Sequence, residues 1–296
     1  MKQFGKLYAL VFTFALIAFS TYALLDTFVI TRVYSSVEQS INTSANIDTV
    51  EAAATPRSLS VEAAESDATS YRDENMSISL STYYENDTTI YVADIQVDSP
   101  ELLKTALSQN SYGRNVTDET SDTASSVEAI LAINGDNYGS REKGYVIRNG
   151  VLYRDAASKG QEDLVIYEDG SFEVINESEI SAQELIDSGA VHVFSFGPGL
   201  IEDGDIIVDA DDEVDRAKAS NPRTAIGILD ENHYVFVVSD GRSSESEGLT
   251  LKELALFMQR LGVQYAYNLD GGGSSTMVFL DEVINNPTSG HSNGER

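Results

Sequence analysis

The sequence predicts an α+β domain with a mixed, mainly antiparallel sheet and a few packed helices, preceded by a transmembrane helix. Short runs rich in β-branched and aromatic residues alternate with turn signals over most of the chain, which is typical of hairpins in an antiparallel sheet. Two capping boxes, Ser181 with Glu184 and Thr250 with Glu253, mark helix starts. An uncharged apolar run from Leu7 to Leu25 lies near the N-terminus.

Composition narrows the classes of function. The chain has 296 residues, with 48 acidic against 19 basic side chains and a formal charge of −29. Phosphate contacts need clustered Lys and Arg, so a nucleic acid partner is not expected. The chain has no Cys, which excludes disulfides, thiolate metal sites and a cysteine nucleophile. The three His do not by themselves form a zinc site, so no metal-ligating residues and no cofactor are predicted, while the sequence does not settle whether a divalent metal is required.

The N-terminal region reads as a membrane anchor. Lys2 and Lys6 precede the apolar run and Asp26 follows it. A membrane-spanning helix needs about 20 apolar residues, and positive charge favours the cytoplasmic side. Residues 1–34 are therefore predicted to be a signal anchor in the cell membrane, single-pass, with the remaining chain extracytoplasmic. A signal cleaved near residues 21–23 and a buried soluble helix are the alternatives.

Two further regions follow the anchor. Residues 35–75 are polar and rich in Ser, Thr and Ala, and are predicted to be a flexible stalk with some helix around 61–65. Residues 76–296 are predicted to be the folded domain. It begins with a hairpin, residues 78–82 and 89–97, and a helix from Pro100 to Ser108 that has Ser99 at its N-cap. Residues 110–126 are expected to be a solvated loop.

The middle of the domain is a series of strands. Residues 127–134 are predicted to be a strand, and hairpins are expected at Asn149-Gly150 and around residues 168–170. His192 alternates within the strand 191–195, where a packed side chain is favoured over a metal ligand. Residues 209–215 form an acidic cluster interpreted as a solvated loop, because the spacing does not match a calcium-binding loop. A helix begins after Thr250 and ends at Gly262.

The most informative stretch lies near the C-terminus. A strand-like run, residues 265–269, leads into Asp270, which is followed by Gly271, Gly272 and Gly273 and then by Ser274, Ser275 and Thr276. Three glycines between strands weaken a sheet, but they suit a sharp turn or a close approach to a ligand. Backbone N–H groups in such a turn form an anion-binding nest. A glycine-rich hairpin turn capped by hydroxyls is the alternative.

Polar side chains follow four predicted strands. If these strand ends converge, they form a pocket with guanidinium, carboxylate and amide groups beside the glycine nest. Arginine suits bidentate recognition of phosphate, and carboxylates act as acids or bases on glycosidic bonds. Structural ion pairs are the alternative for the arginines. The residues at these strand ends are Asn134, Gly135 and Asp136, then Arg223, then Asp240 and Arg242, and then Asn268 and Asp270.

These motifs resemble one known family. AINGDNYG, FSFGPGL, PRTAIGI, SDGR and NLDGGGSSTM occur in that order, and from residue 129 to the end the chain is similar to the phosphodiester glycosidase family. That family includes the uncovering-enzyme catalytic domain specific for N-acetylglucosamine-1-phosphodiesters and bacterial exopolysaccharide-biosynthesis-type members. Membership implies a hydrolase that cleaves a sugar-1-phosphodiester, here in cell-surface glycopolymers or exopolysaccharide, and leaves a phosphomonoester.

The chemistry of the residues at these motifs predicts a role for each. The expected catalytic residues are Asp270 and Asp240, as acid or base, with Arg223. The expected substrate-binding residues are Asn134, Gly135, Asp136, Arg242, Asn268, Gly271, Gly272, Gly273, Ser274 and Ser275. Two features depart from the family pattern: Asp136-Asn137-Tyr138 replaces a glycine followed by aromatic residues, and the chain stops where another strand is expected. A non-catalytic, membrane-tethered binder of phosphate-containing polysaccharide is the alternative function, and a structural surface protein is a third.

Overall fold

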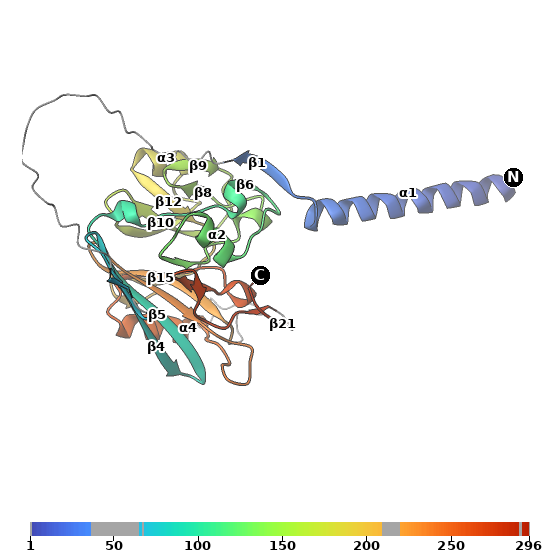
Figure 1. The fold of residues 1–296 in the computed structure, drawn as a ribbon. Helices are drawn as coiled ribbons and strands as arrows, with labels where there is room; N and C mark the ends of the chain where they lie inside the picture. Colours follow the sequence, from blue (N-terminus) through green and yellow to red (C-terminus); the bar gives the residue numbers. More distant parts are fainter. Residues whose placement is uncertain (1, 37–64, 67, 209–219, 290–291, 296) are drawn as a thin grey trace, which may run out of the picture.

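The computed structural model describes residues 2–36, 65–66, 68–208, 220–289 and 292–295 (Figure 1). The long helix α1, Lys2–Phe28, projects away from a folded body made of sheets and short helices. The acidic cluster at residues 209–215 lies outside the described residues, as does most of the predicted stalk, including residues 61–64.

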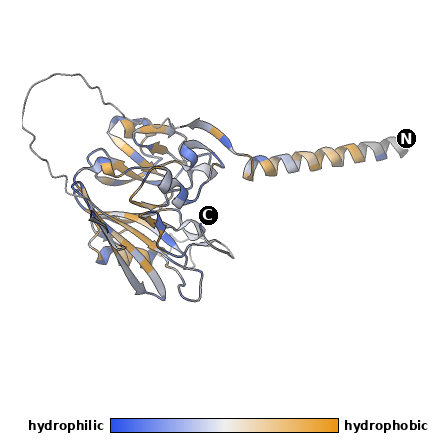
Figure 2. Cartoon of the chain, in the orientation of Figure 1, coloured by the Kyte–Doolittle hydropathy of each residue, from blue (hydrophilic) through white to orange (hydrophobic). Residues whose placement is uncertain are grey.

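Helix α1 is apolar along its length and none of its membrane-length segment, Leu10–Phe28, is buried against the body (Figure 2). It is long and apolar enough to cross a membrane. Strand β1, Arg32–Ser36, follows almost at once and pairs antiparallel with β6, Ser111–Arg114. The folded body therefore includes residues that the sequence assigns to the anchor and the stalk.

A nine-stranded sheet forms the centre of the body, and every pair of neighbours in it is antiparallel. The predicted α+β class with a mainly antiparallel sheet is confirmed. In spatial order its strands are β14 (Asp205–Ile206), β13 (Gly199–Glu202), β17 (Tyr265–Asn268), β15 (Arg223–Asp230), β16 (His233–Ser239), β5 (Thr88–Val97), β4 (Met76–Glu85), β3 (Ser70–Arg72) and β2 (Glu65–Ser66).

Two smaller sheets accompany the central one. One has five strands in the order β11 (Phe172–Asn176), β10 (Glu162–Tyr167), β12 (Ala190–Phe194), β8 (Val146–Arg148) and β9 (Val151–Arg154). The other has three strands, β19 (Glu282–Val283), β18 (Met277–Phe279) and β7 (Leu131–Ile133). Near the C-terminus β20 (Thr288–Ser289) pairs with β21 (Ser292–Asn293).

The core has two main layers, one on each face of the nine-stranded sheet. Helix α4, Leu251–Arg260, covers one face with an apolar stripe that includes Leu254 and Met258. On the other face, Ile226 and Phe236 pack in one cluster with Leu164 of the five-stranded sheet. Because alternate residues of a strand point to opposite faces, β15 and β16 contribute to both layers.

Several local predictions are confirmed. Helix α3, Ala182–Asp187, and helix α4 both begin at the predicted capping boxes, with Ser181 and Thr250 as N-caps. The turn between β8 and β9 has positive φ at Asn149 (50°) and Gly150 (75°), as a two-residue hairpin turn requires.

Three predictions about elements are wrong. The helix expected at residues 100–108 is replaced by two 3-10 turns, Pro100–Leu102 and Ser108–Asn110, because the residues between them bond to distant partners. The Thr105 N–H donates to the Asn149 side chain, and the His192 ring bonds to the Leu103 carbonyl.

The expected loop at residues 110–126 contains β6 and helix α2, Thr120–Ser126. The strand expected from Val127 starts only at Leu131, because Glu128 has positive φ (54°) and the Ala129 N–H bonds back to Ala124 at the end of α2. The pairing of β6 depends on β1, which lies far away in sequence, so local patterning gave no sign of it.

Candidate functional site

The predicted strand ends converge at one edge of the nine-stranded sheet. Arg223 at the start of β15 lies opposite Ser239 at the end of β16, and Ala225 lies opposite Asn268 at the end of β17. Antiparallel pairing brings the start of one strand to the end of its neighbours, so the residues that follow β16 and β17 meet here.

The Asn134 side chain joins three segments at this edge. Its amide nitrogen donates to the Asp270 carbonyl at 2.6 Å, and its oxygen accepts from the Thr224 hydroxyl at 2.8 Å and the Thr276 N–H at 3.1 Å. A neighbouring bond runs from the Asp270 N–H to the Gly135 carbonyl at 3.1 Å. Asn134 and Gly135 therefore fix the backbone of Asp270, and the amide predicted to bind sugar has partners within the protein.

The glycine loop, residues 271–273, is in contact with the backbone of Pro222, directly before β15. The Gly272 N–H donates to the Pro222 carbonyl at 2.8 Å, and Gly272 has a φ of 64°. A Cβ on Gly271 would lie 2.9 Å from the Pro222 carbonyl oxygen, closer than side chains tolerate. Gly271 is required by close backbone approach and Gly272 is favoured by its positive φ, and one of the three N–H groups of the expected nest is used within the protein.

Arg242 lies against the outer side of this loop. A Cβ on Gly272 would lie 2.7 Å from Nη2 of Arg242. The guanidinium donates from Nε and Nη2 to the Asn221 side-chain oxygen, at 3.2 and 2.9 Å, and the residue is exposed. Within the part of the chain that the structure describes, no carboxylate oxygen lies within 4.0 Å of it. Its positive charge is thus placed beside the loop without an acidic partner there.

Arg223 occupies a different environment from Arg242. It is buried, with 6% of its surface exposed, and its Nε donates to the Leu249 carbonyl at 2.8 Å. Its backbone N–H donates to the Ser239 hydroxyl at 3.0 Å. Arg223 therefore holds the start of β15 against the segment that leads into α4.

Asp240 is buried and accepts hydrogen bonds from the segment after β19. The Asn286 N–H donates to one oxygen at 2.8 Å, and the Asn286 amide and the Tyr91 hydroxyl donate to the other at 3.0 and 3.2 Å. Burial, together with the Asp240 charge, raises the pKa of Tyr91 to about 12, so this hydroxyl remains a donor at neutral pH. Asp240 fixes residues 285–286 to the strand ends.

Asn268 and Ser275 support the loop from within. The Asn268 amide nitrogen donates to the Gly197 carbonyl at 2.8 Å, and the Ser275 carbonyl accepts from Asn285 at 2.9 Å. Among the described residues, the Asn268 side-chain oxygen and the Ser275 hydroxyl are buried without a hydrogen-bond partner. Such groups are usually satisfied by water or a ligand, so the underside of the loop has unused polar capacity.

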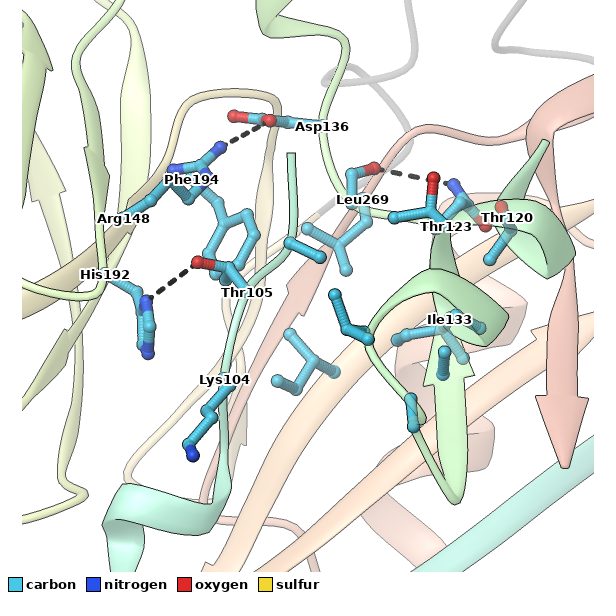
Figure 3. Close-up of a pocket in the computed structure, with 18 of the residues that line it drawn as sticks. Lys104, Thr105, Thr120, Thr123, Ile133, Asp136, Arg148, His192, Phe194 and Leu269 are labelled. Carbon is cyan, nitrogen blue, oxygen red and sulfur yellow. Dashed lines mark hydrogen bonds and ion pairs between the residues drawn. The ribbon is translucent and has the colours of Figure 1, made fainter. Parts of the chain in front are cut away.

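A cavity of about 670 Å³ lies beside the loop, and Asp270 and Ser274 line it together with Asn134, Gly135 and Asp136. Figure 3 shows its walls, which come from the five-stranded sheet on one side and β7 on the other. Of the predicted site residues, those that do not line this cavity lie at or behind the loop: Arg223, Asp240, Arg242, Asn268, Gly271, Gly272, Gly273 and Ser275.

Asp136 forms a buried ion pair with Arg148 across the cavity wall (Figure 3). The two atoms lie 2.6 Å apart, and the side chains are 2% and 4% exposed. The second Asp136 oxygen accepts from the Ser195 N–H at 3.0 Å, and the guanidinium lies 4.4 Å from the Phe194 ring centroid. Both oxygens of this predicted substrate ligand thus have partners within the protein.

A second buried acidic group was not predicted from the sequence. Asp163 on β10 is fully buried, and neither carboxyl oxygen has a hydrogen-bond partner among the described residues. Burial first, and then the Glu177 charge, raises its pKa to about 9. Glu177 accepts from the Tyr145 N–H at 2.7 Å and the Ser195 hydroxyl at 3.0 Å. Asp163 stands in an otherwise ordinary apolar strand, so no sequence pattern singled it out.

His192 is a packed strand residue, as the sequence indicated. It is 3% exposed, and burial lowers its pKa to about 4, so the ring is neutral near pH 7. Its ring bonds to Thr105, Leu103 and the Asn149 N–H. Across the described ranges, no group of three or more His, Asp or Glu side chains is placed to hold a metal ion.

Comparison with known proteins identifies related sequences. The family model for phosphodiester glycosidase matches residues 127–296. The chain is 33% identical over 167 residues to the SPbeta prophage-derived uncharacterized protein YomE of Bacillus subtilis (strain 168), covering 55% of this chain and 26% of that protein. It is 28% identical over 159 residues to mouse N-acetylglucosamine-1-phosphodiester α-N-acetylglucosaminidase, covering 49% and 30%. The chain thus spans less than one third of either relative.

Solved structures share the fold. The catalytic domain of zebrafish N-acetylglucosamine-1-phosphodiester α-N-acetylglucosaminidase, auto-inhibited by its pro-peptide, aligns with a TM-score of 0.56 and 22% identity, over 76% of this chain and 81% of that one. A hypothetical protein from Synechocystis aligns with a TM-score of 0.52 and 14% identity, over 72% and 59%. At such identities the likeness shows a common fold.

Proposed function

This chain belongs to the phosphodiester glycosidase family, and from that premise we propose that it hydrolyses sugar-1-phosphodiesters. Water adds to the anomeric carbon as the bond from that carbon to the phosphate oxygen breaks. The products are the free sugar and a phosphomonoester. A mammalian relative is named for this reaction on N-acetylglucosamine-1-phosphodiesters, which supports an N-acetylglucosamine-like sugar here.

The observation that carries the proposal is the position of Asp270. It is half-buried, lines the cavity, and its backbone is held on both sides by Asn134 and Gly135. A carboxyl group on a backbone held in this way can transfer a proton at the anomeric centre, provided that the anomeric carbon lies beside it at the cavity mouth. We assign this acid or base role to Asp270.

The other predicted site residues are assigned either substrate-binding or positioning roles. The exposed Arg242 guanidinium beside Gly272 stabilises the phosphodiester charge at the loop, and Ser274 donates a hydroxyl from the cavity side. Arg223 and Asp240 are positioning residues, because their described contacts tie the strand ends to neighbouring segments.

The proposed location follows from α1. Its length and apolar surface support an anchor, and the lysines that precede the apolar run favour an extracytoplasmic domain. The substrate is then a sugar-1-phosphodiester of the cell envelope, in cell-surface glycopolymers or exopolysaccharide.

Turnover of a defined substrate tests the proposal. Full-length protein in lipid nanodiscs is incubated with the methyl phosphodiester of α-N-acetylglucosamine-1-phosphate, with and without chelator, and free sugar is measured. We expect turnover, and a loss of about 10²–10⁴-fold in Asp270→Asn, the range for removing a general acid or base. Asp281→Asn, an exposed aspartate in the turn after β18, is the matched control and should be unchanged.

Two results would count against this function. Full activity in Asp270→Asn would remove the role given to that carboxyl group. Saturable sugar binding without turnover, under every condition, would favour a non-catalytic binder of phosphate-containing polysaccharide.

A further inference from the structure

The cavity beside Asp270 extends far from the glycine loop. Strand β5 runs from the site edge, where the Asp240 N–H bonds to the Thr89 carbonyl, to Val97 at its opposite end. At about 3.3 Å per residue, the two ends of this strand are roughly 25 Å apart. The cavity is lined by Asp270 near one end of the strand and by Val97 at the other. It is therefore elongated, and a single sugar-phosphate fills only part of it.

The walls away from the loop are mostly apolar. Ile95 and Phe236 line the cavity from the central sheet, and Leu102 and Val127, which also line it, are 36% and 40% exposed. Protein interiors are close-packed, so a cavity of about 670 Å³ is unusual, and its volume is within the usual range for small-molecule sites.

Some polar groups in the wall have partners within the protein, whereas the Asn137 side-chain oxygen and the Tyr138 hydroxyl, which also line the cavity, are buried without a hydrogen-bond partner among the described residues. Asp136 is paired with Arg148, and His192 bonds to Thr105 (Figure 3). A polar polymer would need donors and acceptors along the whole cavity. The wall instead presents more apolar than polar surface, and Asp270 and Ser274 stand at the end beside the glycine loop.

The cavity also lies beside the end of the apolar helix. Asn115 lines the cavity, and its side chain donates to the Thr27 and Ile30 carbonyls at 3.3 and 3.0 Å. The Thr31 hydroxyl donates to the Asn115 carbonyl at 3.2 Å. Pairing of β1 with β6 holds this junction against the body (Figure 1). With α1 in a bilayer, the cavity is adjacent to the membrane surface.

From these observations we propose that the cavity binds a long hydrocarbon chain, so that the substrate is a glycosyl phosphodiester whose non-sugar arm is lipid-like. The inference rests on the proposed function and narrows its substrate class. The phosphate lies at the cavity mouth beside Asp270 and Ser274, the sugar lies toward the glycine loop, and the hydrocarbon arm on the phosphate extends between the sheets toward Val97.

The test varies the hydrocarbon group on the phosphate and keeps the sugar-phosphate part of the substrate the same. Full-length protein in nanodiscs is assayed with α-N-acetylglucosamine-1-phosphodiesters that have methyl, hexyl, decyl or citronellyl arms. We expect kcat/KM to rise with arm length, by up to about fourfold for each methylene that enters the cavity. The comparison of decyl with citronellyl shows whether an acyl-like or an isoprenoid-like chain fits better, and a gain with either supports the proposal.

A matched pair of variants separates cavity binding from partition into the nanodisc. Val97→Trp narrows the far end of the cavity, whereas Val151→Trp makes the same change on an exposed strand position outside it. Val97→Trp should remove most of the gain with arm length and leave the methyl substrate unchanged, and Val151→Trp should behave as the native chain. An equal gain in both variants would overturn the proposal.

A binding readout keeps the inference testable without turnover or if Val97→Trp fails to fold. The chain has no Trp, so Val127→Trp at the cavity rim is a single reporter. Its emission should shift at lower concentrations of the decyl compound than of the methyl compound. Turnover without dependence on arm length would overturn this inference alone. Arm-dependent binding without turnover would support it while removing the proposed function.

Discussion

Two arginines near the predicted site, Arg148 and Arg242, lie in opposite environments. Arg148 is buried, stacks on Phe194 and is neutralised by Asp136. Arg242 is exposed, bonds to an uncharged Asn221 side chain, and lies against Gly272. One guanidinium completes a sealed polar cluster between the sheets, and the other leaves a positive charge at the surface of the glycine loop.

The comparison shows that a gathering of polar residues is not by itself a site. In the sealed cluster, Asp136, Arg148, Ser195 and Glu177 supply one another with partners. Buried groups of this kind stabilise or destabilise the fold according to their pairing. The Asp136–Arg148 pair also lines the cavity but is buried and mutually neutralised, whereas Arg242 at the loop is exposed, so substrate can reach its charge. Changes in the cluster should affect stability, and changes at the loop should affect activity.

The largest expected difference between the two regions, in stability and in activity, is between the Arg148→Met and Arg242→Met variants. Arg148→Met leaves the Asp136 carboxylate buried without its charge partner and should lower the free energy of unfolding by about 3–5 kcal/mol. Arg242→Met should change it by no more than about 0.5 kcal/mol, because the side chain is exposed, while lowering activity about tenfold or more. Denaturant unfolding and initial rates measure both. Equal destabilisation by the two variants would contradict the distinction between the regions.

Asp163, whose carboxyl group is buried close to the Glu177 charge of the sealed cluster, provides a test of that cluster through pH. Its pKa in the folded state, about 9, is above the ordinary 3.8. As pH rises between these values the unfolded chain loses the proton and the folded chain keeps it, so stability falls, by about 1.4 kcal/mol per pH unit for one proton.

Asp163→Asn removes this titration. The free energy of unfolding of the native chain, relative to that of the variant, should therefore decline from near pH 4 to near pH 9 and be constant outside that window. Denaturant titrations at several pH values measure the difference, and parallel curves would show that Asp163 is ionised in the folded protein.

The smallest expected effect concerns the glycine loop. Gly272 and Gly150 both have positive φ, 64° and 75°, so alanine at either site carries a backbone cost of about 1 kcal/mol. A Cβ at Gly150 meets no atom within 4 Å, whereas one at Gly272 meets the Arg242 guanidinium. Gly272→Ala should thus lose activity beyond its stability cost, and Gly150→Ala should not. Rates corrected for folded fraction, from circular dichroism, give the comparison.

Local signals in the sequence predicted much of the fold. Asn149-Gly150, the capping boxes at Ser181 and Thr250, and the alternation in the 89–97 strand each act through neighbouring residues, so no tertiary partner was needed. The incorrect predictions concern elements whose conformation depends on residues far away in the sequence. Residues 103–107 are extended because Asn149 and His192 bond to them, and β6 exists because β1 pairs with it.

In the candidate site, too, some features were predictable from the sequence and others depend on tertiary packing. Glycines beside Asp270 indicated a loop of close backbone approach, and the contacts of Gly271 and Gly272 with Pro222 provide the reason. The partner of Asp136 was not predictable from the sequence. Asp136 follows β7 of the three-stranded sheet and Arg148 ends β8 of the five-stranded sheet, so only the packing of these two sheets brings them together. Asp163 gave no signal at all, since acidic residues such as Glu162 and Asp163 at the start of a strand are usual at a sheet surface, and the burial of Asp163 depends on packing.

By itself the sequence determined the α+β class, the apolar helix at the N-terminus, the turns and helix caps, and the identity of the residues that gather at the strand ends. These follow from backbone preferences and hydrophobic patterning, which act over a few residues. The tertiary structure decided which polar groups are sealed and which are open, that Arg242 rather than Arg148 is exposed, and that a long apolar cavity joins Asp270 to the end of the membrane-type helix. Burial and pairing depend on segments far apart in the chain, and only packing brings them together.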